Sequence, residues 1–219
     1  MASQQHLALA LPNEAPGWSK ADILQPRALA AVMEANGEFL GLLAARRVAA
    51  FPDDSLGLHP RVLAALPSRS TGAAALRLPV ALFDIRFRDH QYWSTHAQAS
   101  VSVRDHGDTT GVDPACLRFV RSAVVLAWHL AQCHPAMARL SLGLEGRSLQ
   151  VIRDVPVGAL DGLACRVASS VRARFARRDA FWQLLCLALK NGAHQERLCI
   201  SAIQLQGAEA ARALPGKQP

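Results

Sequence analysis

Aromatic residues are scarce in this chain of 219 residues, where they make up 5% of the total and include a single tyrosine. Hydrophobic residues nevertheless make up 51%, with alanine and leucine dominating. A β-sandwich would need more Val, Ile, Thr and Tyr, so this composition favours helices packed on helices. We therefore expect an all-α fold, with enough chain for one large domain or two small ones.

Long apolar runs are missing as well. The longest, residues 123–131, is interrupted by His129 and is far too short to cross a bilayer. The N-terminus has no positively charged segment ahead of its apolar residues, so we expect no secretory signal. These absences predict a cytoplasmic protein with no membrane contact.

Paired cysteines are absent too. The five cysteines are scattered and form no CxxC pair, which is typical of reduced core thiols rather than of a disulfide framework or a zinc site. His129, Cys133 and His134 come close together in the sequence, but a structural zinc site needs four ligands and no second pair is found. We expect neither a metal nor another cofactor.

No catalytic signature is present: the chain has no GxSxG, HExxH, Walker loop or GxGxxG after a strand. Asp89 and His90 are neighbouring acid–base groups, but adjacent residues on a helix point about 100° apart and would not easily share a site. Asp89 is better suited to beginning a helix. We expect a protein that is not an enzyme.

What the sequence does contain is a repeated order of landmarks. Ser-Leu-Gly-Leu occurs at residues 55–58 and again at 141–144, and each copy is followed by an apolar-spaced segment that ends at a proline. An Arg-Phe pair (86–87 and 174–175) and then a tryptophan (Trp93 and Trp182) follow in both halves at nearly equal spacing. We interpret the chain as a tandem duplication of a unit of about 80 residues.

The duplication predicts an organisation in four parts: a lead-in over 1–20, a first helical unit over 21–95, a linker over 96–113 and a second helical unit over 114–213. Apolar spacing predicts long helices over 28–50, 117–133, 180–191 and 196–212. The aromatic pairs Tyr92-Trp93 and Phe181-Trp182 would seat the helix that follows them in each unit. β-Branched and aromatic residues in 79–87 and 167–175 leave open that these two segments pair as short strands.

Positive charge is confined to one half of the chain. Residues 1–110 carry 10 Lys+Arg and 10 Asp+Glu, whereas residues 111–219 carry 14 and 7, which accounts for the whole net charge of +7. Such asymmetry suggests that the second half meets a polyanion, usually nucleic acid. A generally arginine-rich composition would give the same charge without that role, so both interpretations stay open.

The spacing around Gly143 fits a helix-turn-helix. Ala138, Gly143 and Leu144 occupy its small, turn and apolar positions, and Leu149, Ile152 and Val155 would face inward from the second helix. The outward face would then present Arg and Gln side chains able to reach bases or phosphates. A helical hairpin with no DNA role would show the same spacing. The residues assigned here to nucleic-acid binding are Arg139, Arg147, Ser148, Gln150 and Arg153.

Residues 166–178 add five arginines. If this segment is helical, Arg166, Arg174 and Arg177 fall within roughly 80° of one another and form a stripe that faces phosphates, with Arg178 beside it. The matching segment of the first unit balances Arg86 and Arg88 with Asp84 and Asp89. We therefore expect the first unit to make protein contacts and the second to bind DNA.

The second unit resembles the flagellar transcriptional regulator FlhD family, over residues 127–182 and more faintly over 40–93. The matching order is Ala-Met-Ala-Arg-Leu-Ser-Leu-Gly-Leu (136–144), Leu149, Ile152, Val155-Pro156, Leu163-Ala164 and Arg174-Phe175. The resemblance implies an all-helical, dimeric protein that binds DNA with a partner subunit, present here as two FlhD-like units in one chain. The alternative is a non-enzymatic adaptor or accessory protein of a secretion or motility system that acts through protein contacts.

Overall fold

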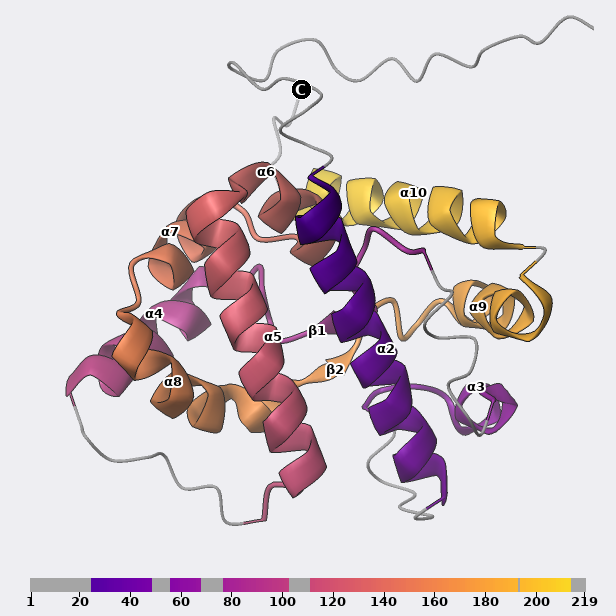
Figure 1. The fold of residues 1–219 in the computed structure, drawn as a ribbon, viewed down its shortest axis with the longest axis horizontal. Coiled ribbons are helices and arrows are strands. Elements are labelled where there is room, and N and C mark those ends of the chain that lie inside the picture. The colour runs from indigo at the N-terminus through magenta and orange to yellow at the C-terminus, as the bar shows by residue number, and fades with distance from the viewer. Residues whose placement is uncertain (1–24, 49–55, 68–76, 103–110, 193, 214–219) are drawn as a thin grey trace, which may run out of the picture.

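The computed structural model of the chain describes residues 25–48, 56–67, 77–102, 111–192 and 194–213, and it is mostly helical, as the composition predicted (Figure 1). The first half contains α2 (Pro26–Val48), α3 (Pro60–Ala65), β1 (Phe83–Asp84) and α4 (His90–Ser102). The second half contains α5 (Pro114–Cys133), α6 (Pro135–Met137), the π-helix η2 (Ala138–Leu142), α7 (Gly146–Arg153), the 3-10 helix η3 (Val157–Ala159), α8 (Leu160–Val167), the 3-10 helix η4 (Ala168–Ser170), β2 (Arg172–Ala173), α9 (Asp179–Asn191) and α10 (Gln195–Ala213).

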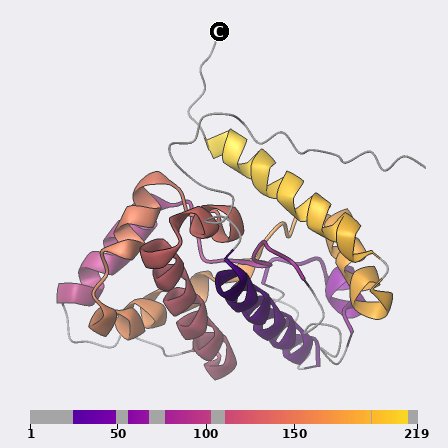
Figure 2. The same ribbon diagram turned by 45° about the horizontal axis from the view of Figure 1, so that its top comes forward.

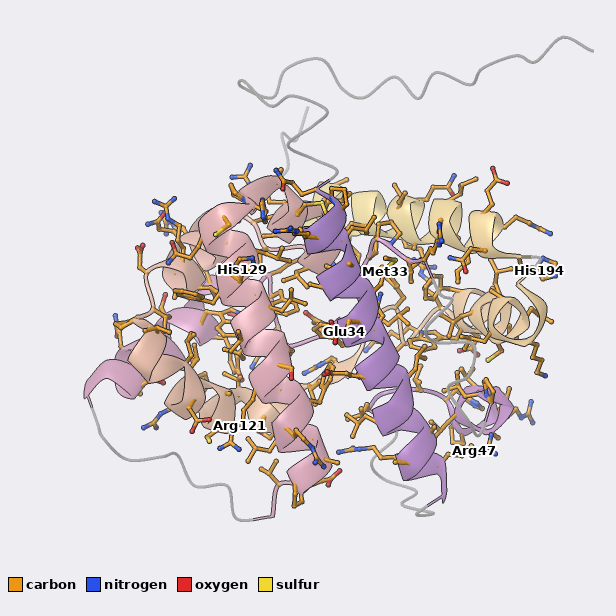
Figure 3. All side chains as sticks on the ribbon, in the orientation of Figure 1. Met33, Glu34, Arg47, Arg121, His129 and His194 are labelled. Carbon is orange, nitrogen blue, oxygen red and sulfur yellow. The ribbon has the colours of Figure 1, made fainter. Side chains whose placement is uncertain are left out.

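The four long helices predicted from apolar spacing are present as α2, α5, α9 and α10. Helices α2 and α5 pack side by side and run in opposite directions through the middle of the fold (Figures 1 and 2). At the end of α2, Arg47 reaches toward α3 and donates to the carbonyl of Ala64 at 3.2 Å (Figure 3). Residues 49–50, the end of the first predicted helix, lie outside the described residues.

The strand pairing left open by the sequence is what the structure shows. Strands β1 and β2 are antiparallel, with Phe83 opposite Ala173 and Asp84 opposite Arg172. The helix considered for residues 166–178 is therefore wrong, because α8 ends at Val167 and the chain passes through η4 into β2. The backbone at Val171 is extended (φ −65, ψ 135) and leads into the strand. Just beyond the strand, the amide of Arg174 donates to the carbonyl of Leu82 at 2.8 Å.

The two halves exchange elements on either side of this strand pair. Helix α4 of the first half packs on α7 and α8 of the second, and α9 of the second half packs on α3 of the first. The two Ser-Leu-Gly-Leu turns take part in the exchange: the amide of Ala173 donates to the carbonyl of Leu56 at 2.7 Å, and the amide of Ala81 donates to that of Ser141 at 2.9 Å. This reciprocity is what the duplication would require, although the duplication itself stays a prediction.

The predicted linker needs correction at its first part. Helix α4 continues to Ser102, so residues 96–102 are helical, and residues 103–110 lie outside the described residues. The reason is packing, since Ala97 is buried in a core that contains side chains of both halves. The described units therefore share one hydrophobic core.

The recurring tryptophans are core residues, as predicted. Trp93 and Trp182 are fully buried, and their indole Nε1 atoms donate to the carbonyls of Arg86 at 3.0 Å and Arg174 at 3.1 Å. Seven residues before each tryptophan the backbone is left-handed, at Arg86 (φ 54) and Phe175 (φ 55). The backbone therefore aligns Arg86 with Phe175, one position away from the Arg86–Arg174 match suggested by the letters.

Helix α2 is long and apolar enough over residues 26–47 to cross a membrane by length and composition, and half of its apolar stretch is buried inside the fold. A buried core helix of a soluble protein meets the same criterion. Packing against α5 accounts for the apolar residues on that side of α2.

Asn36 of α2 forms hydrogen bonds with the buried segment that leads into β1. Its side chain is fully buried, its Nδ2 donates to the carbonyls of Leu78 at 3.3 Å and Val80 at 3.0 Å, and its Oδ1 accepts from the amide of Leu82 at 2.8 Å. Leu78 and residues 80–82 are buried without regular secondary structure, so their polar backbone groups need such partners.

We expect Asn36→Ala to destabilise the protein by about 3 kcal/mol or more, because three buried backbone groups would lose their partner. Glu38→Ala, at an exposed position of the same helix, should change stability by less than about 0.5 kcal/mol. Urea unfolding followed by circular dichroism measures both. Equal losses in the two variants would show that the Asn36 hydrogen bonds do not matter.

Candidate arginine-lined groove

A groove of about 1100 Å³ lies where the two strands lead into α4 and α9. It is lined by residues of the β1–α4 connection, by β2 and the β2–α9 connection, by Leu56 and Gly57, and by Glu209 of α10. Its charged side chains are Arg86, Arg88, Arg172, Arg174, Arg177 and Arg178 against Asp84, Asp89 and Glu209. Six arginines facing three carboxylates give this arginine groove a formal excess of three positive charges.

Three of these arginines were missed by sequence reasoning. Arg86 and Arg88 belong to the first unit, which was expected to be neutral and to contact protein, and Arg172 fell outside the proposed helical stripe. The strand pairing is what brings all three to the same groove. Only the β-branched residues of the two segments could have indicated this pairing from sequence.

Arg174 was predicted to face DNA from a helix, and this prediction is wrong. Its side chain is 4% exposed and extends beneath the Ser-Leu-Gly-Leu turn of its own half. Nη1 donates to the carbonyl of Ser141 at 3.0 Å, and Nη2 contacts Oε1 of Gln206 and lies 3.4 Å from Oε2 of Glu209. Burial lowers the pKa of Arg174, and the charge of Glu209 opposes that shift.

Gly143 makes room for this buried guanidinium. Its φ of +76 is left-handed, and a Cβ built on it would collide with Nη2 of Arg174 and lie 3.1 Å from Nε2 of Gln206 and 3.3 Å from Nε of Arg88. Both the backbone conformation and the crowding exclude a side chain. The glycine of the second Ser-Leu-Gly-Leu turn is thus explained by an arginine 31 residues later in the chain.

Arg88 shares the carboxylate of Glu209 with Arg174. Its Nη1 lies 3.6 Å from Oε2 of Glu209, and its Nη2 donates to the carbonyl of Gln206 at 3.5 Å. Its Nε is buried and, among the described residues, has no hydrogen-bond partner. Arg88 and Arg174 therefore share the carboxylate of Glu209, and Asp84 adds a second negative charge that acts on Arg174.

The outer arginines differ in how they are paired. Arg86 forms an ion pair with Asp89 at 2.8 Å and lies 4.6 Å over the ring of Tyr92. Arg172, Arg177 and Arg178 are exposed, and within the described part of the chain their side chains have no hydrogen bond or ion pair. These three are available to an anion from solution.

The predicted recognition helix, α7, packs on α4 and α5. Leu149, Ile152 and Val155 are buried as expected, but Ser148 is also buried at 1% exposure, so its assignment to nucleic-acid binding is wrong. It lies one residue before Leu149, on the side of the helix that packs inward. Arg147, Gln150 and Arg153 are exposed, and the Gln150 amide donates to the Asp154 carboxylate at 2.7 Å.

The nine predicted residues do not form one surface. Helix α7 lies on the opposite side of the fold from α9, at whose start Arg177 and Arg178 stand (Figure 1). Arg139 is exposed on η2, where its carbonyl accepts from Gln206 at 3.0 Å, and Arg166 is half-buried on α8. The structure brings Arg174, Arg177 and Arg178 together in the arginine groove and leaves the others elsewhere.

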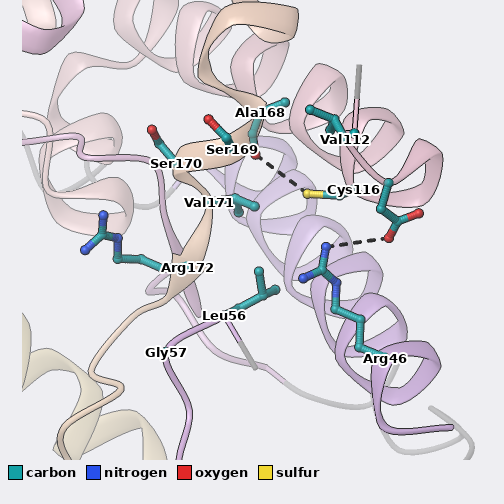
Figure 4. Close-up of a pocket in the computed structure, with 12 residues that line it drawn as sticks. Arg46, Leu56, Gly57, Val112, Cys116, Ala168, Ser169, Ser170, Val171 and Arg172 are labelled. Carbon is teal, nitrogen blue, oxygen red and sulfur yellow. Dashed lines mark hydrogen bonds and ion pairs between the residues drawn. The ribbon is translucent and has the colours of Figure 1, made fainter. Parts of the chain in front are cut away.

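A second hollow, of about 430 Å³, lies among α2, α5 and η4 (Figure 4). Arg46 is 8% exposed there and pairs with Asp113 at 3.5 Å, and Cys116 Sγ lies 3.7 Å from the carbonyl of Ala168. Arg172 also lines this hollow but points away from Arg46 (Figure 4). Because Asp113 offsets the charge of Arg46, this hollow attracts anions less than the arginine groove does.

The cysteine–histidine cluster does not gather further ligands. His129 lies on α5 (Figure 3), and its ring centroid is 5.9 Å from that of His134. Among the residues that the structure describes, no three His, Cys, Asp or Glu side chains come close enough to hold a metal ion.

No protein-family model, curated protein or solved structure matches the chain significantly.

Two glycine substitutions separate backbone strain from crowding at Gly143. Gly192→Ala, at another left-handed position with nothing near the added Cβ, should cost about 1 kcal/mol. Gly143→Ala should cost about 2 kcal/mol more than that, because the new methyl group must displace the buried Arg174 guanidinium. Equal losses in urea unfolding would contradict the close approach of Arg174 to Gly143.

Proposed function

We propose that the chain is a bacterial FlhD-like regulatory protein that binds DNA through the arginine groove. The observation that carries this proposal is the group formed by Arg172, Arg177 and Arg178, which are exposed and have no ion-pair partner among the described residues, at a groove with excess positive charge. Arginine side chains that neutralise phosphates supply most of the affinity of proteins for nucleic acid. An all-helical fold and the resemblance to FlhD support the same proposal.

The position of Arg178 supports a binding role because it does not serve stability. Asp89, at the matching position of the first unit, accepts a hydrogen bond from the amide of Tyr92 at 2.9 Å and so caps α4. Arg178 precedes α9 and makes no side-chain cap. A cation at a helix N-terminus opposes the helix dipole, which Asp179 in the first turn of α9 complements, and losing a cap typically costs about 1 kcal/mol. A phosphate bound beside Arg177 and Arg178 would reverse this electrostatic penalty.

The arginine groove fits DNA better than the exposed face of α7. Arg147 and Arg153 on α7 are accompanied by Glu145 and Asp154 at its two ends, so this short helix is electrically balanced. The groove, in contrast, keeps an excess of three positive charges. A polyanion is therefore drawn to the groove first.

Binding of the purified protein to random-sequence duplex DNA should weaken steeply as salt rises. If the three unpaired arginines each contact one phosphate, log K should fall with log salt with a slope of about −2.7. Fluorescence anisotropy of a labelled duplex across a salt series measures this slope. Absence of binding at low salt would overturn the proposal.

Two double charge reversals locate the surface. Arg177→Glu with Arg178→Glu should weaken binding at least about tenfold and reduce the magnitude of the salt slope by about two. Arg147→Glu with Arg153→Glu changes the net charge equally and should leave binding much closer to that of the unaltered protein. The reverse result would place the DNA on α7, as the helix-turn-helix prediction has it, and would overturn the role of the groove.

A second candidate is an adaptor that acts through protein contacts. Leu187 on α9 and Ile200 and Ile203 on α10 are large apolar side chains that are 45–50% exposed. Ile200 and Ile203 are three residues apart and share one face of α10. We propose that the partner subunit implied by the FlhD resemblance binds this surface. If the protein does not bind duplex DNA, protein contacts at this surface would be its function.

A further inference from the structure

The carboxylate of Glu209 lies near two arginine side chains but forms no short hydrogen bond with either. Its Oε2 atom lies 3.4 Å from Nη2 of Arg174 and 3.6 Å from Nη1 of Arg88. Charge-assisted hydrogen bonds between guanidinium and carboxylate are usually about 2.7–2.9 Å long. The carboxylate therefore sits between the two guanidinium groups without closing a short bond to either.

The site around Glu209 leaves a guanidinium donor unsatisfied. Arg88 and Arg174 share the Glu209 carboxylate, Asp84 adds a second negative charge that acts on Arg174, and Nε of Arg88 is a buried donor without a partner among the described residues. Arg174 is almost fully buried, so its charge receives little help from solvent. A phosphodiester carries the same single charge as a carboxylate but has more acceptor oxygens, so it could accept from more of these donors than Glu209 does.

We propose that Glu209 occupies a phosphate-binding position and acts as a built-in competitor for the phosphodiester groups of nucleic acid. This inference rests on the proposed DNA binding of the arginine groove and names a regulatory residue within it. A phosphodiester that reaches Arg88, whose side chain is 25% exposed, takes the place of the Glu209 carboxylate, which swings toward solvent. Glu209 is already 33% exposed, so its side chain has room to leave.

Gln206 allows this exchange without loss of α10. It is buried at 5% exposure one turn before Glu209, contacts Arg174 through Oε1, and donates through Nε2 to the carbonyl of Arg139 at 3.0 Å. These bonds anchor α10 whether or not Glu209 is in place. Displacement of the Glu209 carboxylate by a phosphodiester therefore requires only the rotation of the Glu209 side chain.

Glu209→Gln keeps the size of the side chain and removes its charge. We expect this variant to bind a labelled random-sequence duplex about fivefold to tenfold more tightly than the unaltered protein. Glu196→Gln is the matched control, because Glu196 is exposed on the first turn of the same helix and the change in net charge is identical. The control should bind as the unaltered protein does.

A measurement on the unaltered protein makes the test independent of how Glu209→Gln folds. The side-chain carboxyl ¹³C resonance of Glu209, among six glutamates in the chain, should shift on titration with duplex DNA, whereas that of Glu196 should not.

The outcomes separate the two proposals. Tighter binding by Glu209→Gln alone, with movement of its resonance, supports the competitor. Binding that Arg177→Glu with Arg178→Glu weakens, with no effect of Glu209→Gln and no shift of the resonance, leaves the proposed function intact and overturns the competitor. Absence of binding by both the unaltered protein and Glu209→Gln overturns both.

Discussion

The buried guanidinium of Arg174 is the interaction on which the second half of the structure depends. A charge removed from water must be surrounded by acceptors, and here they come from three places: the Ser141 carbonyl, Gln206 and Glu209. The turn before α7 must therefore point a carbonyl inward, Gly143 must carry no side chain, and α10 must dock with Gln206 facing down. The amide of the same residue also donates to Leu82 of the first half, so one residue links both halves with the last helix.

If the chain is the predicted duplication, the two halves differ at the position of this arginine. Trp93 and Trp182 are 89 residues apart, and by this offset Ile85 matches Arg174. Ile85 is fully buried in the core, and its hydrophobic side chain needs no polar partner. An arginine at the matching place needs a set of acceptors, and α10, the last helix of the second unit, provides two of them through Gln206 and Glu209. The buried Arg174 and the helix α10 that supplies two of its acceptors are therefore linked features by which the second half differs from the first.

Features that depend on residues close together in the sequence could be predicted, whereas features that depend on contacts between distant residues could not. Helices such as α5 and α9, and the inward-facing Leu149, Ile152 and Val155, follow from local periodicity and were predicted correctly. The burial of Arg174 and Ser148 was not predicted, because assigning them to an outward face assumed a helix or a helix face that the neighbouring segments do not leave open. The arginine groove requires strands from the two halves to meet, and although the residues of 79–87 and 167–175 left this pairing open, no local pattern shows which side chains it brings together. Asn36 was overlooked for the same reason, since its partners are more than 40 residues away.

The exchange of elements between the halves has a consequence for any ligand of the groove. Arg86 and Arg88 come from the connection that follows β1, whereas Arg172, Arg177 and Arg178 come from β2 and the connection after it. The strand pair and the packing of α4 on α7 and α8 hold these connections in place. Neither half contains the groove alone, because its walls exist only where the two strands meet. An anion that bridges the walls gains affinity only when both halves are folded together, so its binding free energy adds to the stability of their association.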